Sequence, residues 1–178
     1  MDQYRRKFLS RLLAGSSVII SAPAWASKGS PEERSLALRN LHTGEHIREV
    51  YWSDGGYLEE GLATINHALR DHRSGEVYAV DHNLLDILHL LHRSVEGRRE
   101  FEVISGYRSP STNAKLRSKS GGVARRSLHM QGKAIDIRLP GCNLAQLRKA
   151  ALAMRAGGVG YYPESNFIHV DTGRVRRW

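Results

Sequence analysis

The spacing of the apolar residues changes along the chain, and this change limits the possible folds more than any other feature. In three segments, apolar residues recur every three or four positions, as they do on one face of a helix. These segments are residues 58–69, 84–95 and 144–154. The other apolar runs are short, as strands are. They lie at residues 35–52, where a polar His-Thr-Gly-Glu sequence divides the run as in a hairpin, and at 101–104, 133–139, 159–162 and 167–170.

Capping residues mark the ends of two of these helices. Asp81 and Asn143 precede the second and third helical segments, and both are residue types that cap helix N-termini. Gly97 and the pair Gly157-Gly158 are expected to end the same two helices. Helices that come first, followed by short strands in close succession, predict an α+β domain with helices packed on a small, mostly antiparallel sheet.

Residues 1–26 have the layout of a secretory leader rather than of a folded segment. A charged start precedes an apolar stretch at residues 12–22, and the small residues Ala24 and Ala26 have the spacing of a cleavage site. The apolar stretch is too short to cross a bilayer of roughly 30 Å as a stable helix. We therefore expect a leader, a polar linker at residues 27–33 and one domain at residues 34–178, with no stable membrane span after cleavage.

The paired arginines Arg5 and Arg6, followed closely by Phe8 and Leu9, resemble the start of a twin-arginine leader, which an export receptor reads. A general secretory leader that happens to hold two arginines is the alternative. An uncleaved leader would instead tether the chain to a membrane. The expected location is the periplasm, reached by the twin-arginine route.

The charge of the chain points to an anionic partner. The formal net charge is +9, of which the four basic residues and one acidic residue of the leader supply +3, leaving +6 on the mature chain. The sequence has no nucleic-acid-binding motif, and an exported protein rarely meets nucleic acid, so an anionic wall polymer is the expected partner. The only cysteine, Cys142, cannot form an internal disulfide, so the fold must depend on its core or on a metal.

Three residues have the chemistry of a metal site: His129, Asp136 and His169. Asp136 and His169 each lie between two apolar residues, and a buried carboxylate is costly unless it is paired or bound to a metal. Imidazole and carboxylate ligands suit zinc, and three protein ligands leave the fourth position that a catalytic zinc needs for water. On spacing alone, ordinary hydrogen-bonded residues explain the pattern better, because the chain has nine histidines.

Three motifs shift that balance. Residues 127–136 (Ser-Leu-His-Met-Gln-Gly-Lys-Ala-Ile-Asp) match the Ser-x-His-x-x-Gly-x-Ala-x-Asp signature of the zinc D-Ala-D-Ala peptidases. Residues 105–109 resemble the arginine-bearing segment of that superfamily, and residues 167–173 resemble its third-ligand strand. The strong matches cover residues 102–178 and are most similar to the exported, murein-endopeptidase branch. The resemblance implies the D-Ala-D-Ala metallopeptidase/hedgehog-like fold with a zinc site.

The resemblance also implies a role for each matching residue. His129, Asp136 and His169 would bind Zn²⁺. Arg108 would hold the substrate carbonyl or carboxylate and stabilise the developing oxyanion. Ser127 would form a hydrogen bond with the substrate beside the scissile bond.

The chain departs from the superfamily pattern at the general base. Carboxypeptidase relatives often place an acidic base three residues before the last histidine, where this chain has Asn166. The nearby carboxylates are Asp171 and Glu164. Asp171 lies on the same strand face as His169, so we favour it, either as the base or as a residue that orients a ligand. Glu164 lies in a loop and is the other candidate.

The expected function is a periplasmic zinc metallo-endopeptidase that hydrolyses the peptide cross-links of peptidoglycan, with the peptide stems as its partner. Two alternatives are a D-Ala-D-Ala carboxypeptidase, which Asn166 disfavours, and a non-catalytic peptidoglycan-binding relative. A helix is expected at residues 112–118, and residues 115–126 are expected to contain a basic, flexible loop. This basic segment either steers an anionic polymer toward the site or is simply solvated. The oligomeric state cannot be predicted from the sequence.

Overall fold

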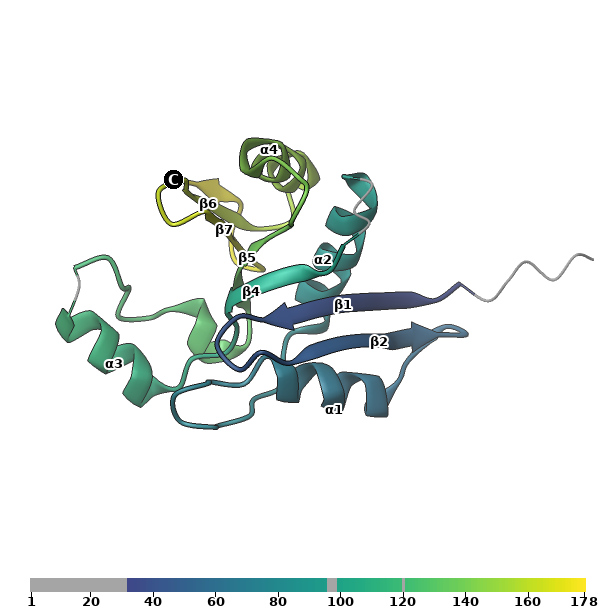
Figure 1. The fold of residues 1–178 in the computed structure, drawn as a ribbon, viewed down its shortest axis with the longest axis horizontal. Coiled ribbons are helices and arrows are strands. Elements are labelled where there is room, and N and C mark those ends of the chain that lie inside the picture. Colours follow the sequence, from purple (N-terminus) through teal and green to yellow (C-terminus); the bar gives the residue numbers. More distant parts are fainter. Residues whose placement is uncertain (1–31, 96–98, 120) are drawn as a thin grey trace, which may run out of the picture.

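A computed structural model describes residues 32–95, 99–119 and 121–178. The predicted leader, most of the predicted linker and Gly97 lie outside these residues, so the leader and the domain boundaries stay predictions. Figure 1 shows helices lying against a single twisted sheet. The described part of the chain contains four α-helices and eight strands. The predicted α+β class and the mostly antiparallel sheet are confirmed, although eight strands make a larger sheet than predicted.

The sheet is assembled from both halves of the chain. Its strands are β1 (Arg34–Asn40), β2 (His46–Ser53), β3 (Gly56–Tyr57), β4 (Phe101–Ser105), β5 (Ala134–Arg138), β6 (Gly158–Tyr162), β7 (Phe167–Asp171) and β8 (Arg176–Arg177). Their order across the sheet is β3-β2-β1-β4-β5-β7-β6-β8. The pairs β1–β4 and β6–β8 are parallel, and the other neighbours are antiparallel.

The helices follow the apolar patterns of the sequence. They are α1 (Glu59–Ala68), α2 (His82–Ser94), α3 (Pro110–Lys119) and α4 (Leu144–Met154), and a short 3-10 helix, η1, spans Leu128–Gln131. Helix α1 packs against β2, α2 against β1 and α4, and α4 against β6 and β7. Their buried leucines meet Ile135 and Ile137 of β5, which are fully buried in the same core.

The helix ends agree with the sequence in part. Asp81 and Asn143 are N-caps, because their side chains accept hydrogen bonds from the amides of Asn83 and Ala145. The prediction that glycines end α4 is wrong, because the helix ends two residues earlier, at Arg155 in a left-handed conformation. Gly157 serves packing instead, since a side chain there would collide with the backbone of β7.

The segment predicted as a basic, flexible loop is partly helical. Helix α3 runs from Pro110 to Lys119, and two residues favour its start. The Ser109 hydroxyl accepts a hydrogen bond from the Thr112 amide, and Pro110 fits the first helical turn. Only the part of the predicted loop that follows Lys119 is irregular in the described residues. Within the described ranges, no helix has the length and apolar character that spanning a membrane requires.

Candidate metal centre

The three predicted metal ligands lie together at one side of the sheet. His129 comes from η1, Asp136 from β5 and His169 from β7. Antiparallel pairing places Asp136 directly opposite His169, and Gly132, with a φ of 64°, allows the chain to turn from η1 into β5. All three residues are buried, with only 3–9% of their surface exposed. The fold therefore brings together residues that are 40 positions apart.

The distances between the ligand atoms suit a tetrahedral metal ion. His169 Nδ1 lies 2.8 Å from Asp136 Oδ1, and His129 Nε2 lies 3.2 Å from His169 Nδ1 and 3.4 Å from Asp136 Oδ1. Ligand atoms bound tetrahedrally to zinc at roughly 2.0–2.1 Å are about 3.3 Å apart. The observed triangle is close to that size.

The outer nitrogens of both imidazoles have fixed partners. His129 Nδ1 lies 2.8 Å from the Gly106 carbonyl oxygen, and His169 Nε2 lies 3.0 Å from Asp171 Oδ2. Each outer nitrogen is therefore the N–H donor, and the two inner nitrogens face each other with lone pairs. Two lone pairs 3.2 Å apart beside a carboxylate require a cation or a proton between them. The donor set fits zinc in this respect as well.

The ionisation of the cluster agrees with this arrangement. Burial alone would raise the pKa of Asp136, but the adjacent imidazoles of His129 and His169 outweigh it and hold that pKa well below its usual range. Burial lowers the pKa of His169, yet the adjacent carboxylates of Asp136 and Asp171 raise it overall. The cluster therefore stabilises a positive charge at its centre.

Asp171 lies behind His169 rather than in the pocket. It is fully buried, and its oxygens accept hydrogen bonds from the amides of Gly158 and Gly173 and from both terminal nitrogens of Arg176, at 2.6–3.1 Å. Burial raises the pKa of Asp171, but these bonds and the contact with His169 lower it well below the usual range. Asp171 is thus an ionised carboxylate aimed at the outer edge of a ligand ring. Its partner Arg176 lies in the C-terminal Val-Arg-Arg-Trp segment, and no local pattern predicts this contact.

Arg108 places a positive charge beside the three ligands. Its Nη2 donates to Ser105 Oγ at 3.2 Å and lies 3.8 Å from Asp136 Oδ2, and its side chain is only 12% exposed. Burial lowers the pKa of Arg108, and the charge of Asp136 opposes that shift. Its Nε is buried and has no hydrogen-bond partner among the described residues. Arg108 also lines the pocket described below, so its guanidinium can meet an incoming acceptor there.

A pocket of about 440 Å³ opens over the cluster. It is lined by Arg108, Gly122, Val123, Ala124, Arg126, Ser127, Leu128, His129, Asp136, Tyr162, Phe167, His169, Arg176 and Trp178. The predicted site residues Arg108, Ser127, His129, Asp136 and His169 all line it, whereas Asp171 does not. Glu164 is exposed in the turn before β7 and does not line it either.

An aromatic wall bounds this pocket. Sequence patterns favour a core position for Tyr162 over one that lines a cleft, and they do not assign Phe167 or Trp178 to the wall. The Trp178 ring lies 5.3 Å from that of His169, its indole N–H donates to the Tyr162 hydroxyl at 2.8 Å, and Tyr162 stacks on Phe167 at 4.6 Å. Phe167 shares a strand face with His169, and that alternation is the one signal that could have identified it. The position of Trp178 depends on β8, which is too short to predict.

A buried carboxylate outside the pocket fixes the segment that carries Arg108. Asp71 Oδ2 accepts hydrogen bonds from the amide and the hydroxyl of Ser109, at 2.9 and 2.6 Å, and Oδ1 accepts one from the Arg73 amide. Burial raises the pKa of Asp71, but these hydrogen bonds outweigh it and hold the pKa well below its usual range. Because the pKa is lower in the folded protein, Asp71 stabilises the fold above its unfolded pKa, near 4, and less as the pH falls further.

Asp71→Asn is therefore expected to lower the unfolding free energy at pH 7 by about 2 kcal/mol, since an amide cannot accept all three bonds. The difference from the wild type should shrink as the pH falls from 4 toward 3, because the unfolded wild-type chain then binds a proton at Asp71 that the folded protein does not bind. Urea unfolding of both proteins from pH 7 to pH 3 measures this difference in unfolding free energy. A difference that stays constant with pH would contradict the ionised role of Asp71.

Comparison with known proteins identifies the family. The family model described as "Peptidoglycan L,D-endopeptidase MepK" matches residues 28–178. Proteins of that description from Escherichia coli K12 and Shigella flexneri are 46% identical over 180 residues, covering 99% of this chain and 98% of the relative. A protein from Haemophilus influenzae is 41% identical over 181 residues, covering 100% of this chain and 97% of its own length. No solved structure matches the chain. The chain belongs to the peptidoglycan L,D-endopeptidase MepK family.

Proposed function

We propose that this protein is a periplasmic, zinc-dependent endopeptidase that hydrolyses peptide cross-links of peptidoglycan, and that it is exported by the twin-arginine route. The observation that carries the proposal is the His129, Asp136 and His169 cluster at the floor of a pocket, beside Arg108. Its relatives are described as peptidoglycan L,D-endopeptidases, which supports the same substrate and bond type for this chain. The peptide stems of peptidoglycan would occupy the pocket.

Each residue of the pocket would have a distinct role in catalysis. His129, Asp136 and His169 would hold zinc, which supplies a Lewis acid for activating water and polarising the scissile carbonyl. Arg108, which lines the pocket, would donate from its terminal nitrogens to the substrate oxygen on which negative charge develops. Ser127, on the pocket wall, would hydrogen-bond the substrate backbone. The aromatic wall of Tyr162 and Trp178 would exclude water from one side.

The position of Asp171 supports orientation rather than proton transfer. Both of its oxygens are engaged by Arg176, the backbone amides and His169, and it has no exposed surface from which to reach a substrate. We assign it to holding the His169 ring with Nδ1 inward, which also raises the basicity of that ligand. Glu164 is too exposed to have a defined role in the pocket.

Asp171→Asn is expected to weaken zinc binding by about 10–100-fold, because the carboxylate partner of His169 is lost. Turnover at saturating zinc should recover most of its wild-type value, which loss of a general base would not allow. Zinc affinity by competition with a chelating dye, and turnover as a function of added zinc, separate the two roles. Glu164→Gln is the matched control and should change neither quantity. Wild-type zinc affinity combined with lost turnover would instead make Asp171 the base.

The activity is tested by mass analysis of purified muropeptide dimers incubated with the protein. Dimers joined through an L,D bond are expected to become monomers, while dimers joined only through D,D bonds stay intact. Loss of a single D-alanine would instead identify a carboxypeptidase. Intact dimers of both kinds, with zinc shown to be bound, would overturn the enzyme proposal and leave a peptidoglycan-binding protein.

A further inference from the structure

The segment that leads to the metal centre has an unusual charge. No acidic residue occurs between Glu102 and Asp136, whereas seven positions in this interval are basic. These are Arg108, Lys115, Arg117, Lys119, Arg125, Arg126 and Lys133. Only Arg108 has an acidic group within salt-bridge distance among the described residues. The positive charges of the other six are therefore not neutralised by salt bridges within the described fold.

Helix α3, which carries three of these charges, contributes little to the core. Thr112 and Asn113 are its only buried residues, so it has no apolar face to pack. A helix of this kind gains little stability from tertiary packing. Figure 1 shows it at the outer edge of the molecule, with the loop that follows it. Its charged side chains, Lys115, Arg117 and Lys119, are exposed.

The helix is nevertheless held at a defined position by polar contacts at its base. Ser109 is tied to buried Asp71 by two hydrogen bonds. Asn113 donates through Nδ2 to the Ala124 carbonyl at 3.1 Å, which joins the helix to the loop that returns toward the pocket. These contacts hold the helix through Ser109 and Asn113 and do not use its basic side chains. The basic side chains are therefore available to bind a partner.

The same segment is continuous with the pocket. Gly122, Val123, Ala124 and Arg126 of the returning loop form one side of the pocket, and Asn113 Oδ1 lies 3.5 Å from Nη1 of Arg108. Helix α3 therefore adjoins the pocket, within reach of a polymer whose peptide occupies it. A nucleic acid or a lipid surface would have no such connection to the site.

We propose that helix α3 with its exposed Lys115, Arg117 and Lys119, the basic arm, forms a second binding site for the carboxylates of intact, polymeric peptidoglycan outside the cleavage pocket. This inference rests on the proposed function, because it takes the polymer that is cut to be the polymer that is bound. Peptide stems carry free carboxylates, and a cluster of uncompensated positive charges raises their local concentration. The basic arm would then favour the intact wall over soluble fragments, which present few carboxylates beyond the pocket.

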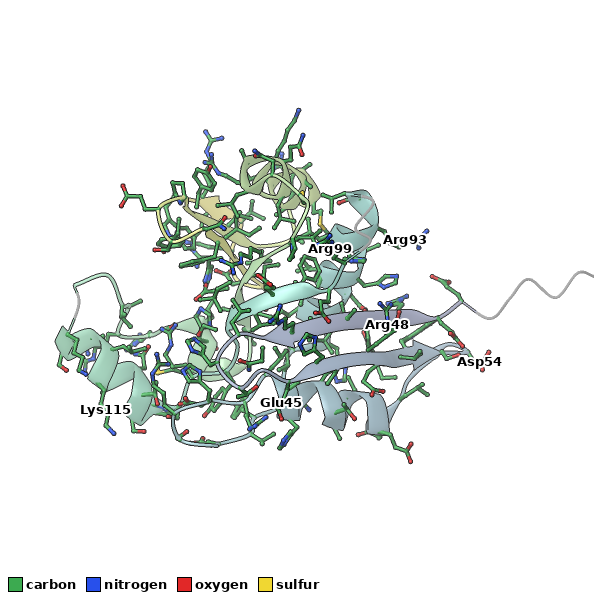
Figure 2. All side chains as sticks on the ribbon, in the orientation of Figure 1. Glu45, Arg48, Asp54, Arg93, Arg99 and Lys115 are labelled. Carbon is green, nitrogen blue, oxygen red and sulfur yellow. The ribbon has the colours of Figure 1, made fainter. Side chains whose placement is uncertain are left out.

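The test compares two variants with the same loss of charge. In the arm variant, Lys115, Arg117 and Lys119, which do not line the pocket, are each replaced by Gln. In the control variant, Arg48, Arg93 and Lys149, which are exposed and lie on β2, α2 and α4, are replaced by Gln. Figure 2 shows Lys115 at one edge of the molecule, and Arg48 and Arg93 toward the other. Glutamine keeps the helix propensity of α3.

Binding is measured by co-sedimentation with insoluble sacculi, which needs no turnover, and cleavage is measured on sacculi and on soluble dimers. The arm variant is expected to bind and digest sacculi roughly 10-fold less well at low salt. It should cleave soluble dimers within about 2-fold of the wild type, and its deficit on sacculi should vanish near 0.5 M salt, where charges are screened beyond roughly 4 Å. The control variant should behave as the wild type.

Wild-type binding of sacculi by the arm variant would overturn the proposal, as would an equal deficit in both variants. An equal loss on soluble dimers would place the arm in the pocket rather than outside it, and would overturn it too. A deficit on anionic lipid vesicles or DNA, but not on sacculi, would assign the arm to another partner. Failure of the wild type to cleave any dimer would overturn the proposed function, whereas the binding comparison would still stand.

Discussion

Replacement of His129 by alanine is expected to abolish both stoichiometric zinc binding and cleavage of cross-linked dimers. His129 supplies one corner of the ligand triangle, and its inner nitrogen lies 3.2 and 3.4 Å from the other two ligand atoms. Loss of a direct ligand should exceed the roughly 10–100-fold loss of metal affinity that follows removal of an outer partner. Zinc per chain after dialysis, determined by elemental analysis, and the rate of dimer cleavage are the two measurements.

The matched control for this variant is His67→Ala, since His67 is an exposed histidine on α1 with its side chain 61% accessible. It should retain one zinc per chain and full activity. The core cluster does not include His129, so the His129→Ala protein is expected to fold. Circular dichroism checks this. A folded His129→Ala protein that keeps one tightly bound zinc, or that cleaves dimers normally, would contradict the assignment.

Replacement of Arg108 has the second largest expected effect. Arg108→Ala should lower kcat by roughly 10²–10³-fold, the usual cost of removing one donor that stabilises an oxyanion. Arg108→Lys should recover only part of that loss, because an ammonium lacks the planar set of donors. Zinc content should stay at one per chain in both, since Arg108 lies 3.8 Å from Asp136 and is not itself a ligand.

The control for Arg108 is Arg39→Lys, an exposed arginine whose nearest carboxylate, on Glu102, lies 3.4 Å away. It should leave kcat and KM unchanged. Separate values of kcat and KM are needed, because a raised KM with unchanged kcat would show that Arg108 only binds the substrate. Loss of zinc in parallel with activity would show that it acts by holding Asp136 in place.

Local patterns were sufficient to predict most elements of the fold. The N-caps Asp81 and Asn143 and the leucine spacing behind them identified α2 and α4, because these signals lie within one or two helical turns. The order of the strands was not predictable in the same way. The parallel pairing of β1 with β4 joins Leu38 to Phe101 and depends on packing across the whole core. Strands β3 and β8 have two residues each and carry no periodicity.

The candidate site shows the same limit. The signature motif pointed to His129 and Asp136, and strand alternation correctly placed Asp171 on the face of His169, within hydrogen-bond distance of its ring. Alternation could not show that Asp171 contacts the outer nitrogen of that ring, behind the ligand set. The contact of Asp71 with Ser109 spans 38 positions, and the Trp178–Tyr162 contact depends on a two-residue strand. Both required the tertiary structure.

The central claim is that His129, Asp136 and His169 hold a zinc ion on which cross-link cleavage depends. The most direct measurement is a zinc titration of the metal-free protein, with dimer cleavage followed by mass analysis in the same samples. We predict that monomers appear in proportion to added zinc, up to one ion per chain, and that the His129→Ala protein yields none at any zinc concentration. Full cleavage by metal-free protein, or intact dimers at one bound zinc per chain, would contradict the claim.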